Sequence, residues 1–356
     1  MVINKKVYME DMYPHDNYIF EEDEDRNEKK SSFQLQDYFG PVLTKNLNES
    51  NLVVFYDFKK KKFKRLYNLS KRLKLDLRFV LIRTEPRIII PSQYNEKIEK
   101  LFDLIIDFGS VHKNNLKHIK GEVWPVSPEV FRKVSLNFCD GDLIDKAILI
   151  SSNKNNFMKD NLYILRKKVV DELSLLVDVY GDGWRNFNIN FVRQLIGAIF
   201  LGIINYKQSI VFSREVICSI SWPKRSANRY LKVRSKANYY KLYKVILVIE
   251  NSGEYLSEKL FEALASGRPV VYVGTDLEKW GIPSDVYVKA NKSLESIRDC
   301  VEELVHNVEL GKNICRNAQD WLQKKSTLEK FSREKVFQRT ATLVQIHAND
   351  NCTTCF

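Results

Sequence analysis

The amino-acid sequence predicts an α/β protein built from two doubly wound domains, each with a parallel sheet. Short apolar runs rich in β-branched residues alternate with helical patterns through most of the chain. These runs are mostly continuous rather than alternating with polar residues, which is typical of parallel strands covered by helices on both faces. The length of 356 residues fits two domains, since a domain has roughly 100–200 residues.

Each expected strand is a short aliphatic or aromatic run. The first has the sequence LVVFYDF and the second RFVLIR. In chain order, we expect strands at Leu52–Phe58, Arg78–Arg83, Phe102–Phe108, Ala147–Ser151, Leu175–Tyr180, Val245–Ile249, Val270–Val273 and Val286–Val288.

The segments between these strands show the apolar spacing of amphipathic helices. One of them carries an apolar stripe, formed by Leu162, Leu165, Val169 and Leu173. Another ends at Gly267, a natural C-terminal cap. In chain order, we expect helices at Lys64–Leu73, Tyr94–Lys100, Asn161–Ser174, Phe191–Ile204, Ser257–Ser266, Leu294–Asn307 and Lys312–Gln323.

Charge and element order divide the chain into four predicted parts. Residues 1–34 are polar and acidic without sustained periodicity, and we expect a flexible arm there. Two domains follow at 35–143 and 144–325, with their junction near Asp140–Lys146. Residues 326–356 are expected to form a C-terminal helix and a tail.

The composition, with 44% hydrophobic and 29% charged residues, is typical of a soluble globular protein. The longest apolar run, Leu195–Ile204, is shorter than the roughly 20 residues that span a bilayer. The N-terminus has no apolar signal segment. Six scattered cysteines do not indicate a disulfide scaffold, and we interpret Cys352-Thr-Thr-Cys355 as part of a frayed tail. We therefore expect a soluble, cytoplasmic protein without a transmembrane segment.

The net charge of +12 is unevenly distributed, because residues 1–30 carry −4 and the remainder +16. Basic residues concentrate at Lys59–Arg65 and at Lys224–Lys244, where tyrosines are interleaved. Such runs fit a nucleic acid, an anionic sugar nucleotide, an anionic membrane surface or only solvent. No nucleic-acid-binding module is recognisable, so we expect no nucleic-acid partner, and a peripheral membrane contact stays open.

Several familiar motifs are missing from the sequence. It has no G-x-x-x-x-G-K-[ST] phosphate loop, no G-x-G-x-x-G and no H-E-x-x-H. Asp140-Gly141-Asp142 has the spelling of a metal-binding Asp-x-Asp, but it precedes the expected strand Ala147–Ser151 instead of following one. We interpret it as a polar turn between domains, and we expect neither a metal nor a cofactor.

The most informative segment is Lys244–Gly274, in which a buried strand ends in a polar loop that opens into a helix. In doubly wound sheets, ligands bind where strands end and helices begin. Ordinary capping explains Ser257 and Glu258 in the first turn, but not Lys259. A cation near a helix N-terminus is unfavourable unless an anion is also there, so we expect a phosphate ligand near Lys259. Glu258 could accept hydrogen bonds from ribose hydroxyls.

Three blocks of residues, spanning about Arg78 to Val288, follow the order of one enzyme family. The main block contains Glu250-Asn251-Ser252, Tyr255-Leu256-Ser257-Glu258-Lys259, Pro269-Val270-Val271 and Gly274. The other two contain Ser151-Ser152-Asn153, Arg166, Val177–Gly181, and Thr84-Glu85-Pro86, Pro91, Tyr94 and Trp124-Pro125. Together they resemble the α1,3/4-fucosyltransferases, glycosyltransferase family 10.

The resemblance implies a GT-B fold, in which two Rossmann-like domains face a cleft. The domain at 144–325 would hold the donor GDP-fucose, and the domain at 35–143 would lie on the acceptor side. The enzyme would be an inverting, metal-independent transferase that moves fucose to a hydroxyl of a glycan acceptor.

The resemblance also implies roles for individual residues. Arg166 and Lys259 would bind the diphosphate in place of a metal ion, and Glu258 would hold the ribose. Asn251 and Tyr255 would contact the nucleotide or the sugar. Glu85 would be the general base that deprotonates the acceptor hydroxyl.

Ordinary structural interpretations exist for the same residues. Arg166 beside its apolar stripe is by default a snorkelling surface residue, Glu85 is a solvated loop acid and Asn251 closes a turn. The sequence departs from the family pattern in a slightly shorter loop from Glu250 to Lys259 and in Ser257, where the family has Thr.

Three alternatives remain open from the residues alone. One is a GT-B glycosyltransferase with another nucleotide-sugar donor, the second is a basic nucleic-acid-binding protein, and the third is an inactive, glycan-binding relative. The sequence makes no prediction for the acceptor glycan, the linkage or the oligomeric state.

Overall fold

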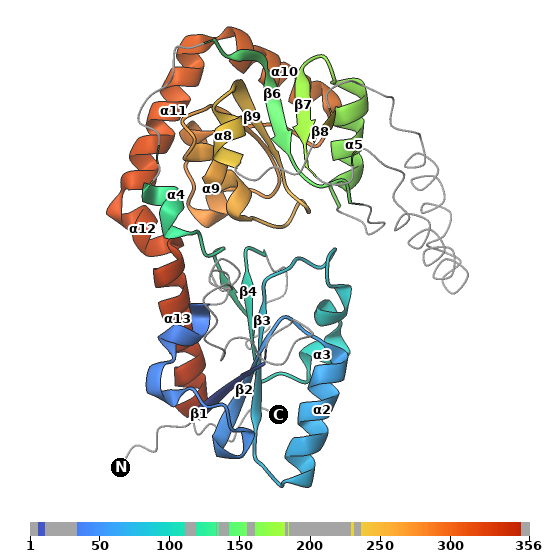
Figure 1. Ribbon diagram of the computed structural model, residues 1–356, viewed down its shortest axis with the longest axis vertical. Coiled ribbons are helices and arrows are strands. Elements are labelled where there is room, and N and C mark those ends of the chain that lie inside the picture. The colour runs from blue at the N-terminus through green and yellow to red at the C-terminus, as the bar shows by residue number, and fades with distance from the viewer. Residues whose placement is uncertain are drawn as a thin grey trace, which may run out of the picture. The chain divides into compact units, whose positions relative to one another are not determined.

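The computed structural model describes residues 6–10, 34–110, 119–132, 134, 142–154, 161–181, 184, 229–230 and 236–349. The chain forms two compact units, each built around one parallel sheet with helices (Figure 1). Unit 1 comprises Met1–Pro125 and Glu329–Phe356, and unit 2 comprises Val126–Leu328. The predicted α/β class with parallel sheets is confirmed.

The limits of these units differ from those of the predicted domains. The division falls between Pro125 and Val126 rather than near Asp140–Lys146. Strand β1 (Lys6–Glu10) lies within the stretch expected to be a flexible arm, and it pairs with the sheet of unit 1. Residues 329–349 group with unit 1, and the helix that they contain contacts the strand Leu104–Phe108 and the 3₁₀ turn Gln34–Tyr38.

The sheet of unit 1 has five parallel strands in the order β1-β2-β3-β4-β5. The strands after β1 are β2 (Ser50–Tyr56), β3 (Arg78–Arg83), β4 (Leu104–Phe108) and β5 (Ile119–Glu122). Every residue of β4 is buried, as expected of a strand covered on both faces. The edge strand β5 is polar and partly exposed.

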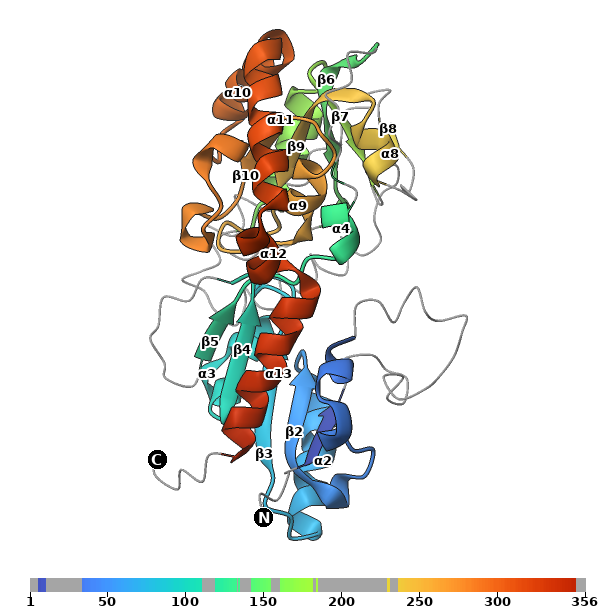
Figure 2. The same ribbon diagram turned by 90° about the vertical axis from the view of Figure 1, so that its left-hand side faces the viewer.

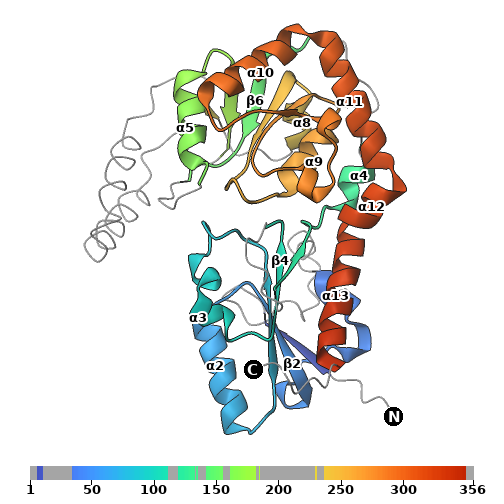
Figure 3. The same ribbon diagram turned by 180° about the vertical axis from the view of Figure 1, so that it is seen from behind.

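Helices cover both faces of this sheet (Figures 1 and 3). On one face lie α2 (Lys60–Arg72) and the short α3 (Glu96–Glu99). Phe63 of α2 inserts among the rings of the core, with ring centroids 5.4–5.6 Å from those of Phe55, Phe79 and Phe102.

The long helix α13 (Arg333–Asn349) covers the other face, as Figure 2 shows. Phe337 of α13 stacks on Phe108 with 6.4 Å between ring centroids. Arg339 forms an ion pair with Glu122 at 2.9 Å, and Arg78 donates to the carbonyl of His347 at 2.7 Å. The C-terminal helix is therefore fastened to the sheet by packing and by charge.

Part of the Lys59–Arg65 basic run has a structural role. Glu10 of β1 is buried, and its carboxylate lies 3.0 Å from the Lys62 ammonium and 3.4 Å from the Arg65 guanidinium. These contacts fasten the edge strand β1 to α2. Lys60, Lys61 and Lys64 are exposed.

The sheet of unit 2 has six parallel strands in the order β11-β10-β9-β6-β7-β8. They are β6 (Ile144–Ile150), β7 (Val177–Tyr180), β8 (Arg229–Tyr230), β9 (Tyr243–Ile249), β10 (Val270–Val273) and β11 (Val288–Lys289). The central strands contribute aliphatic side chains to a core shared with α5 (Tyr163–Glu172) and α10 (Leu294–His306).

Two further helices of unit 2 flank β9 along the chain: α8 (Lys236–Tyr240) leads into its amino end, and α9 (Glu258–Leu264) follows its carboxyl end. Phe261 of α9 stacks on Trp321 of α11 (Val308–Gln323). The short α4 (Pro128–Arg132) precedes β6, and α12 (Lys325–Phe331) follows α11. None of the helices described here is long and apolar enough to cross a membrane.

The expected strands are present to within a few residues, but the sequence analysis missed three: β1, β5 and β8. All three are short or polar edge strands, for which the apolar pattern is weak. The expected helix Tyr94–Lys100 is instead a 3₁₀ turn at Pro91–Tyr94 followed by α3. The expected helix Phe191–Ile204 and Cys352–Cys355 lie outside the described residues, as do residues 224–228 and 231–235 of the basic segment Lys224–Lys244.

Replacing Phe63 by alanine should destabilise unit 1 by about 3–5 kcal/mol, because it leaves a cavity among three aromatic rings. Urea unfolding followed by tryptophan fluorescence and circular dichroism measures the change. Lys64→Ala, at an exposed position of the same helix, is the matched control and should change stability by less than about 0.5 kcal/mol. Equal effects of the two substitutions would contradict this account of the core.

Candidate functional site

The strand order of unit 2 reverses direction between β6 and β9. From β6 the sheet grows outward through β7 and β8, and from β9 it grows the other way through β10 and β11. Doubly wound sheets bind ligands outside the carboxyl ends of their strands at such a reversal. The loop 250–257 and helix α9 directly follow β9, so the segment identified from the sequence lies at this point.

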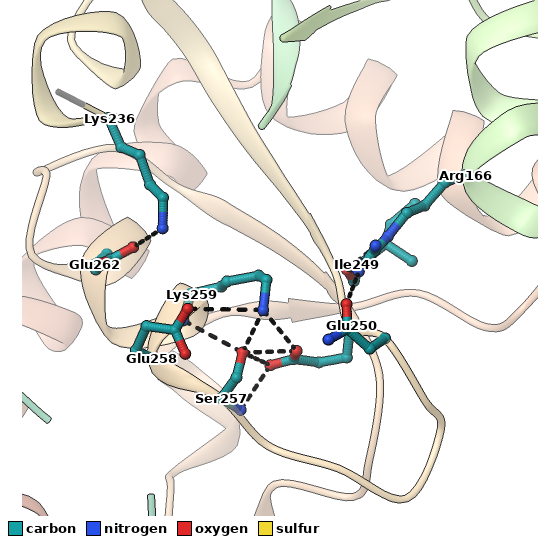
Figure 4. Close-up of polar contacts among 9 residues, drawn as sticks. Arg166, Lys236, Ile249, Glu250, Ser257, Glu258, Lys259 and Glu262 are labelled. Atoms are coloured by element: carbon teal, nitrogen blue, oxygen red, sulfur yellow. Dashed lines mark hydrogen bonds and ion pairs between the residues drawn. The ribbon is translucent and has the colours of Figure 1, made fainter. Parts of the chain in front are cut away.

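Glu250, Ser257 and Lys259 form a polar cluster directly beyond β9 (Figure 4). The fully buried Glu250 carboxylate accepts hydrogen bonds from the Ser257 backbone N–H at 2.9 Å and from its hydroxyl at 2.8 Å. The Lys259 ammonium donates to the same hydroxyl at 2.9 Å and lies 3.7 Å from Glu250. Ser257 also caps α9, accepting from the Lys259 backbone N–H, as the sequence predicted.

Charge keeps Lys259 and Glu258 ionised at neutral pH. Burial lowers the pKa of Lys259, but the carboxylates of Glu258 and Glu250 raise it by more, so the net shift is upward. Burial raises the pKa of Glu258, and the Lys259 and Lys236 ammonium groups outweigh it, so the net shift is downward. The two side chains lie 3.8 Å apart.

Lys236, at the start of α8, adds another cation beside α9. Its ammonium lies 2.5 Å from the Glu262 carboxylate, one turn along α9 from Glu258 (Figure 4). Burial raises the pKa of Glu262, although Lys236 opposes the shift. Lys236 and Lys259 thus each lie beside a carboxylate of α9.

Arg166 of α5 reaches the same strand end from the opposite direction (Figure 4). It is 2% exposed, so the default interpretation of a snorkelling surface residue is wrong. Its guanidinium donates to the carbonyl of Ile249, through Nε at 3.1 Å, and to the side-chain carbonyl of Asn251 at 3.0 Å. Burial lowers the pKa of Arg166 to about 10, which leaves it positively charged at neutral pH.

The loop between β9 and α9 carries the two other residues predicted to contact the donor. Asn251 is held by Arg166, and its backbone carbonyl accepts from the Leu162 N–H at 3.0 Å. Tyr255 is only 3% exposed, so most of its ring lies inside the unit. Arg166, Asn251, Tyr255, Glu258 and Lys259 therefore belong to one end of one sheet, and their contacts with a donor stay predictions.

Glu85, the predicted base, lies in unit 1 in the loop after β3. Its backbone carbonyl accepts from the Tyr94 hydroxyl at 2.8 Å and from the Gln93 side-chain amide at 3.0 Å. Asp57, which follows β2 at a left-handed φ of 58°, accepts from the Thr84 N–H at 2.9 Å. The backbone on both sides of Glu85 is thus held by hydrogen bonds, and its part in catalysis stays a prediction.

A fully buried ion pair lies next to this loop. Arg83 of β3 contacts the Asp107 carboxylate of β4 through two nitrogens, one of them at 3.0 Å, and it also donates to Glu99 at 2.8 Å. Burial raises the pKa of Asp107 to about 7 in spite of Arg83. The guanidinium carbon lies 4.3 Å from the centroid of the Tyr94 ring, which positions the hydroxyl that binds Glu85.

The sequence analysis did not select Glu250, Lys236 or Gly274 as site residues. Glu250 could have been found, because a carboxylate directly after a buried strand needs a partner. The importance of Gly274 is spatial: a Cβ there would lie 2.3 Å from the Tyr272 hydroxyl and 2.9 Å from the Glu250 side chain. Lys236 lies within the basic segment Lys224–Lys244, but nothing in the sequence distinguished it from the other basic residues there.

A scan against protein-family models finds no match, and a search of curated proteins finds none either. Several solved structures share the fold. A glycosyltransferase from Rickettsia africae ESF-5 aligns at a TM-score of 0.53 and 12% identity, over 98% of this chain and all of that one. An α1,3-fucosyltransferase aligns at 0.50 and 13% identity, over 98% and 91% of the two chains.

An α-glucosyltransferase solved with UDP and a mismatched 13-mer DNA also aligns with this chain. Its TM-score is 0.50 at 12% identity, over 87% of this chain and 83% of that one. At identities this low the likeness concerns the fold alone. Together with the two parallel sheets, it confirms that the chain has the GT-B fold.

Proposed function

We propose that this chain is an inverting glycosyltransferase, related to glycosyltransferase family 10, that transfers fucose from GDP-fucose to a hydroxyl group of a glycan acceptor. The observation that carries the proposal is the grouping of Arg166, Asn251, Glu258 and Lys259 around the carboxyl end of β9. These residues come from α5, from the loop after β9 and from α9, and the order of their motifs resembles that of the family. The GT-B fold supports the same class of enzyme.

The donor contacts follow from the charges at this strand end. In the proposal, Lys259 contacts the diphosphate, since its ammonium stays protonated and one-fifth of its side chain is exposed. Arg166 adds a buried positive charge and orients Asn251. Glu258, ionised and 35% exposed, accepts hydrogen bonds from the ribose hydroxyls.

The proposed reaction is a single displacement at the anomeric carbon of fucose. Glu85 takes the proton of the acceptor hydroxyl, and that oxygen forms a bond to the anomeric carbon from the face opposite GDP. The bond between this carbon and the β-phosphate oxygen breaks, and its electron pair leaves with GDP. The positive charges of Lys259 and Arg166 stabilise the departing diphosphate, which is the main electrostatic demand of the step.

The proposal requires that the nucleobase of the donor is guanine. The α-glucosyltransferase that shares the fold was solved with UDP, so a uridine nucleotide is the natural competitor of GDP. A nucleic-acid-binding function would instead show affinity that falls steeply with salt and does not respond to nucleotides.

GDP, and not UDP, CDP or dTDP, should raise the thermal stability of the full-length protein. At 100 times its dissociation constant, a ligand stabilises the native state by about 2.7 kcal/mol, a shift that differential scanning fluorimetry detects. Lys259→Ala should abolish the shift, and EDTA should leave it unchanged. Lys324→Ala, at an exposed lysine of the same unit, is the matched control and should keep the wild-type shift.

The outcomes of this experiment separate the candidate functions. A response to UDP or dTDP alone would retain the glycosyltransferase and reject GDP-fucose. A GDP shift that survives in Lys259→Ala would reject the proposed diphosphate site. Absence of any response in the wild-type protein would contradict a nucleotide-sugar enzyme.

Glu85→Gln should lower the rate of fucose transfer by about 10²- to 10⁴-fold, the usual effect of removing a general base. Its thermal shift with GDP should equal that of the wild type, because the nucleotide contacts belong to unit 2. Transfer from GDP-fucose to N-acetyllactosamine, followed by mass spectrometry, measures the rate. Glu96→Gln, at an exposed acid of unit 1, is the control. A Glu85→Gln enzyme with the wild-type rate would remove Glu85 from the mechanism.

A further inference from the structure

Glu250 presents an energetic problem that the donor contacts do not explain. Its carboxylate is fully buried, and the lysine ammonium beside it lies at 3.7 Å, beyond hydrogen-bond distance. A buried carboxylate is costly unless hydrogen bonds satisfy its oxygens. Here the hydrogen bonds come from Ser257, through the backbone N–H at 2.9 Å and the hydroxyl at 2.8 Å.

The direction of the hydrogen bonds in this cluster is fixed by chemistry. An ammonium group can only donate, so the Ser257 hydroxyl must accept from Lys259 at 2.9 Å. The single hydroxyl hydrogen then points to the Glu250 carboxylate, which as an anion can only accept. The result is a one-way chain from Lys259 through Ser257 to Glu250, in which each bond polarises the next.

The surrounding fold leaves space for these three hydrogen-bonded side chains. The Glu250 side chain passes beside Gly274 at the end of β10, where any Cβ would lie 2.9 Å from it. The Glu250 backbone N–H donates to the carbonyl of Val273 at 2.9 Å, so the residue is held by the neighbouring strand as well. The neighbouring strand and Ser257 therefore both fix its position.

We propose that Glu250 and Ser257 are positioning residues of the donor site, which hold the Lys259 ammonium in place before a nucleoside diphosphate binds. The inference rests on the proposed donor site and adds residues that touch Lys259 rather than the ligand. Lys259 reaches the surface with only part of its side chain, and three hydrogen-bonding or charged neighbours restrain its end. A cation that is already restrained loses less conformational freedom when the ligand binds.

A competing interpretation gives the opposite sign. If Glu250 only competes with the phosphates for Lys259, then neutralising it would free the ammonium and tighten nucleotide binding. If Glu250 positions Lys259 through Ser257, replacing it by glutamine weakens binding, because the negative charge that polarises the Ser257 hydroxyl and attracts the Lys259 ammonium is lost. The direction of the change in affinity therefore distinguishes the two.

Isothermal titration of GDP into the full-length protein tests the proposal with four proteins: wild type, Glu250→Gln, Ser257→Ala and Ser257→Thr. We expect Glu250→Gln and Ser257→Ala to weaken GDP about tenfold, the equivalent of one net hydrogen bond. Ser257→Thr keeps the hydroxyl and should bind within about twofold of wild type. Rescue by threonine would not follow from a general loss of structure.

Tighter binding by Glu250→Gln, or unchanged binding by Ser257→Ala, would overturn the inference. If Glu250→Gln fails to fold, as judged by circular dichroism, the comparison of Ser257→Ala with Ser257→Thr tests the proposal alone, because both variants keep the buried carboxylate. If the wild type binds GDP and every variant binds it with the same affinity, the donor site is retained and the positioning role is rejected. Wild-type protein that binds no nucleoside diphosphate would reject both.

Discussion

The need to satisfy a buried carboxylate determines the conformation of the loop that follows β9. Because the Glu250 carboxylate is buried, the chain must bring the backbone and hydroxyl of Ser257 back to it, which closes the loop and starts α9 at a fixed place. Arg166 secures the other side of the loop through Ile249 and Asn251. The residues that resemble a nucleotide-sugar site are thus presented by a loop whose two ends are both held by buried polar contacts.

Unit 1 also has a buried carboxylate directly after one of its parallel strands. Asp57 directly follows β2, is buried, and accepts from the backbone of Thr84, at the turn that carries Glu85. In unit 1 the aspartate itself has a left-handed backbone conformation, which is uncommon for residues other than glycine. In unit 2 the missing side chain of Gly274 leaves space for the carboxylate of Glu250. In both units, a carboxylate at the end of one strand fixes residues that lie further along the chain.

The sequence was sufficient where local patterns decide the structure. Continuous apolar runs predicted the central strands, and serine followed by glutamate predicted the start of α9. It was insufficient where a partner is distant in the chain. Arg166 is buried because it donates to the carbonyl of Ile249. That residue lies 83 positions away in the chain, so no helical pattern reveals the contact. The polar strand β5 was missed for a different reason, since among the described strands it pairs with β4 alone and it has little apolar surface to bury.

Helix α13 belongs to unit 1 although it follows unit 2 in the chain, and this affects the order in which the two units are synthesised. Unit 2 is one continuous stretch, Val126–Leu328, whereas the sheet of unit 1 is covered on one face by a helix that follows it in the chain. During synthesis, the last residue of unit 2 is therefore added to the chain before the first residue of α13. Until α13 has docked, Phe108 lacks the ring that covers it, and this face of the unit 1 sheet leaves apolar surface exposed. The unit that lies second in the sequence is the first whose residues have all been synthesised.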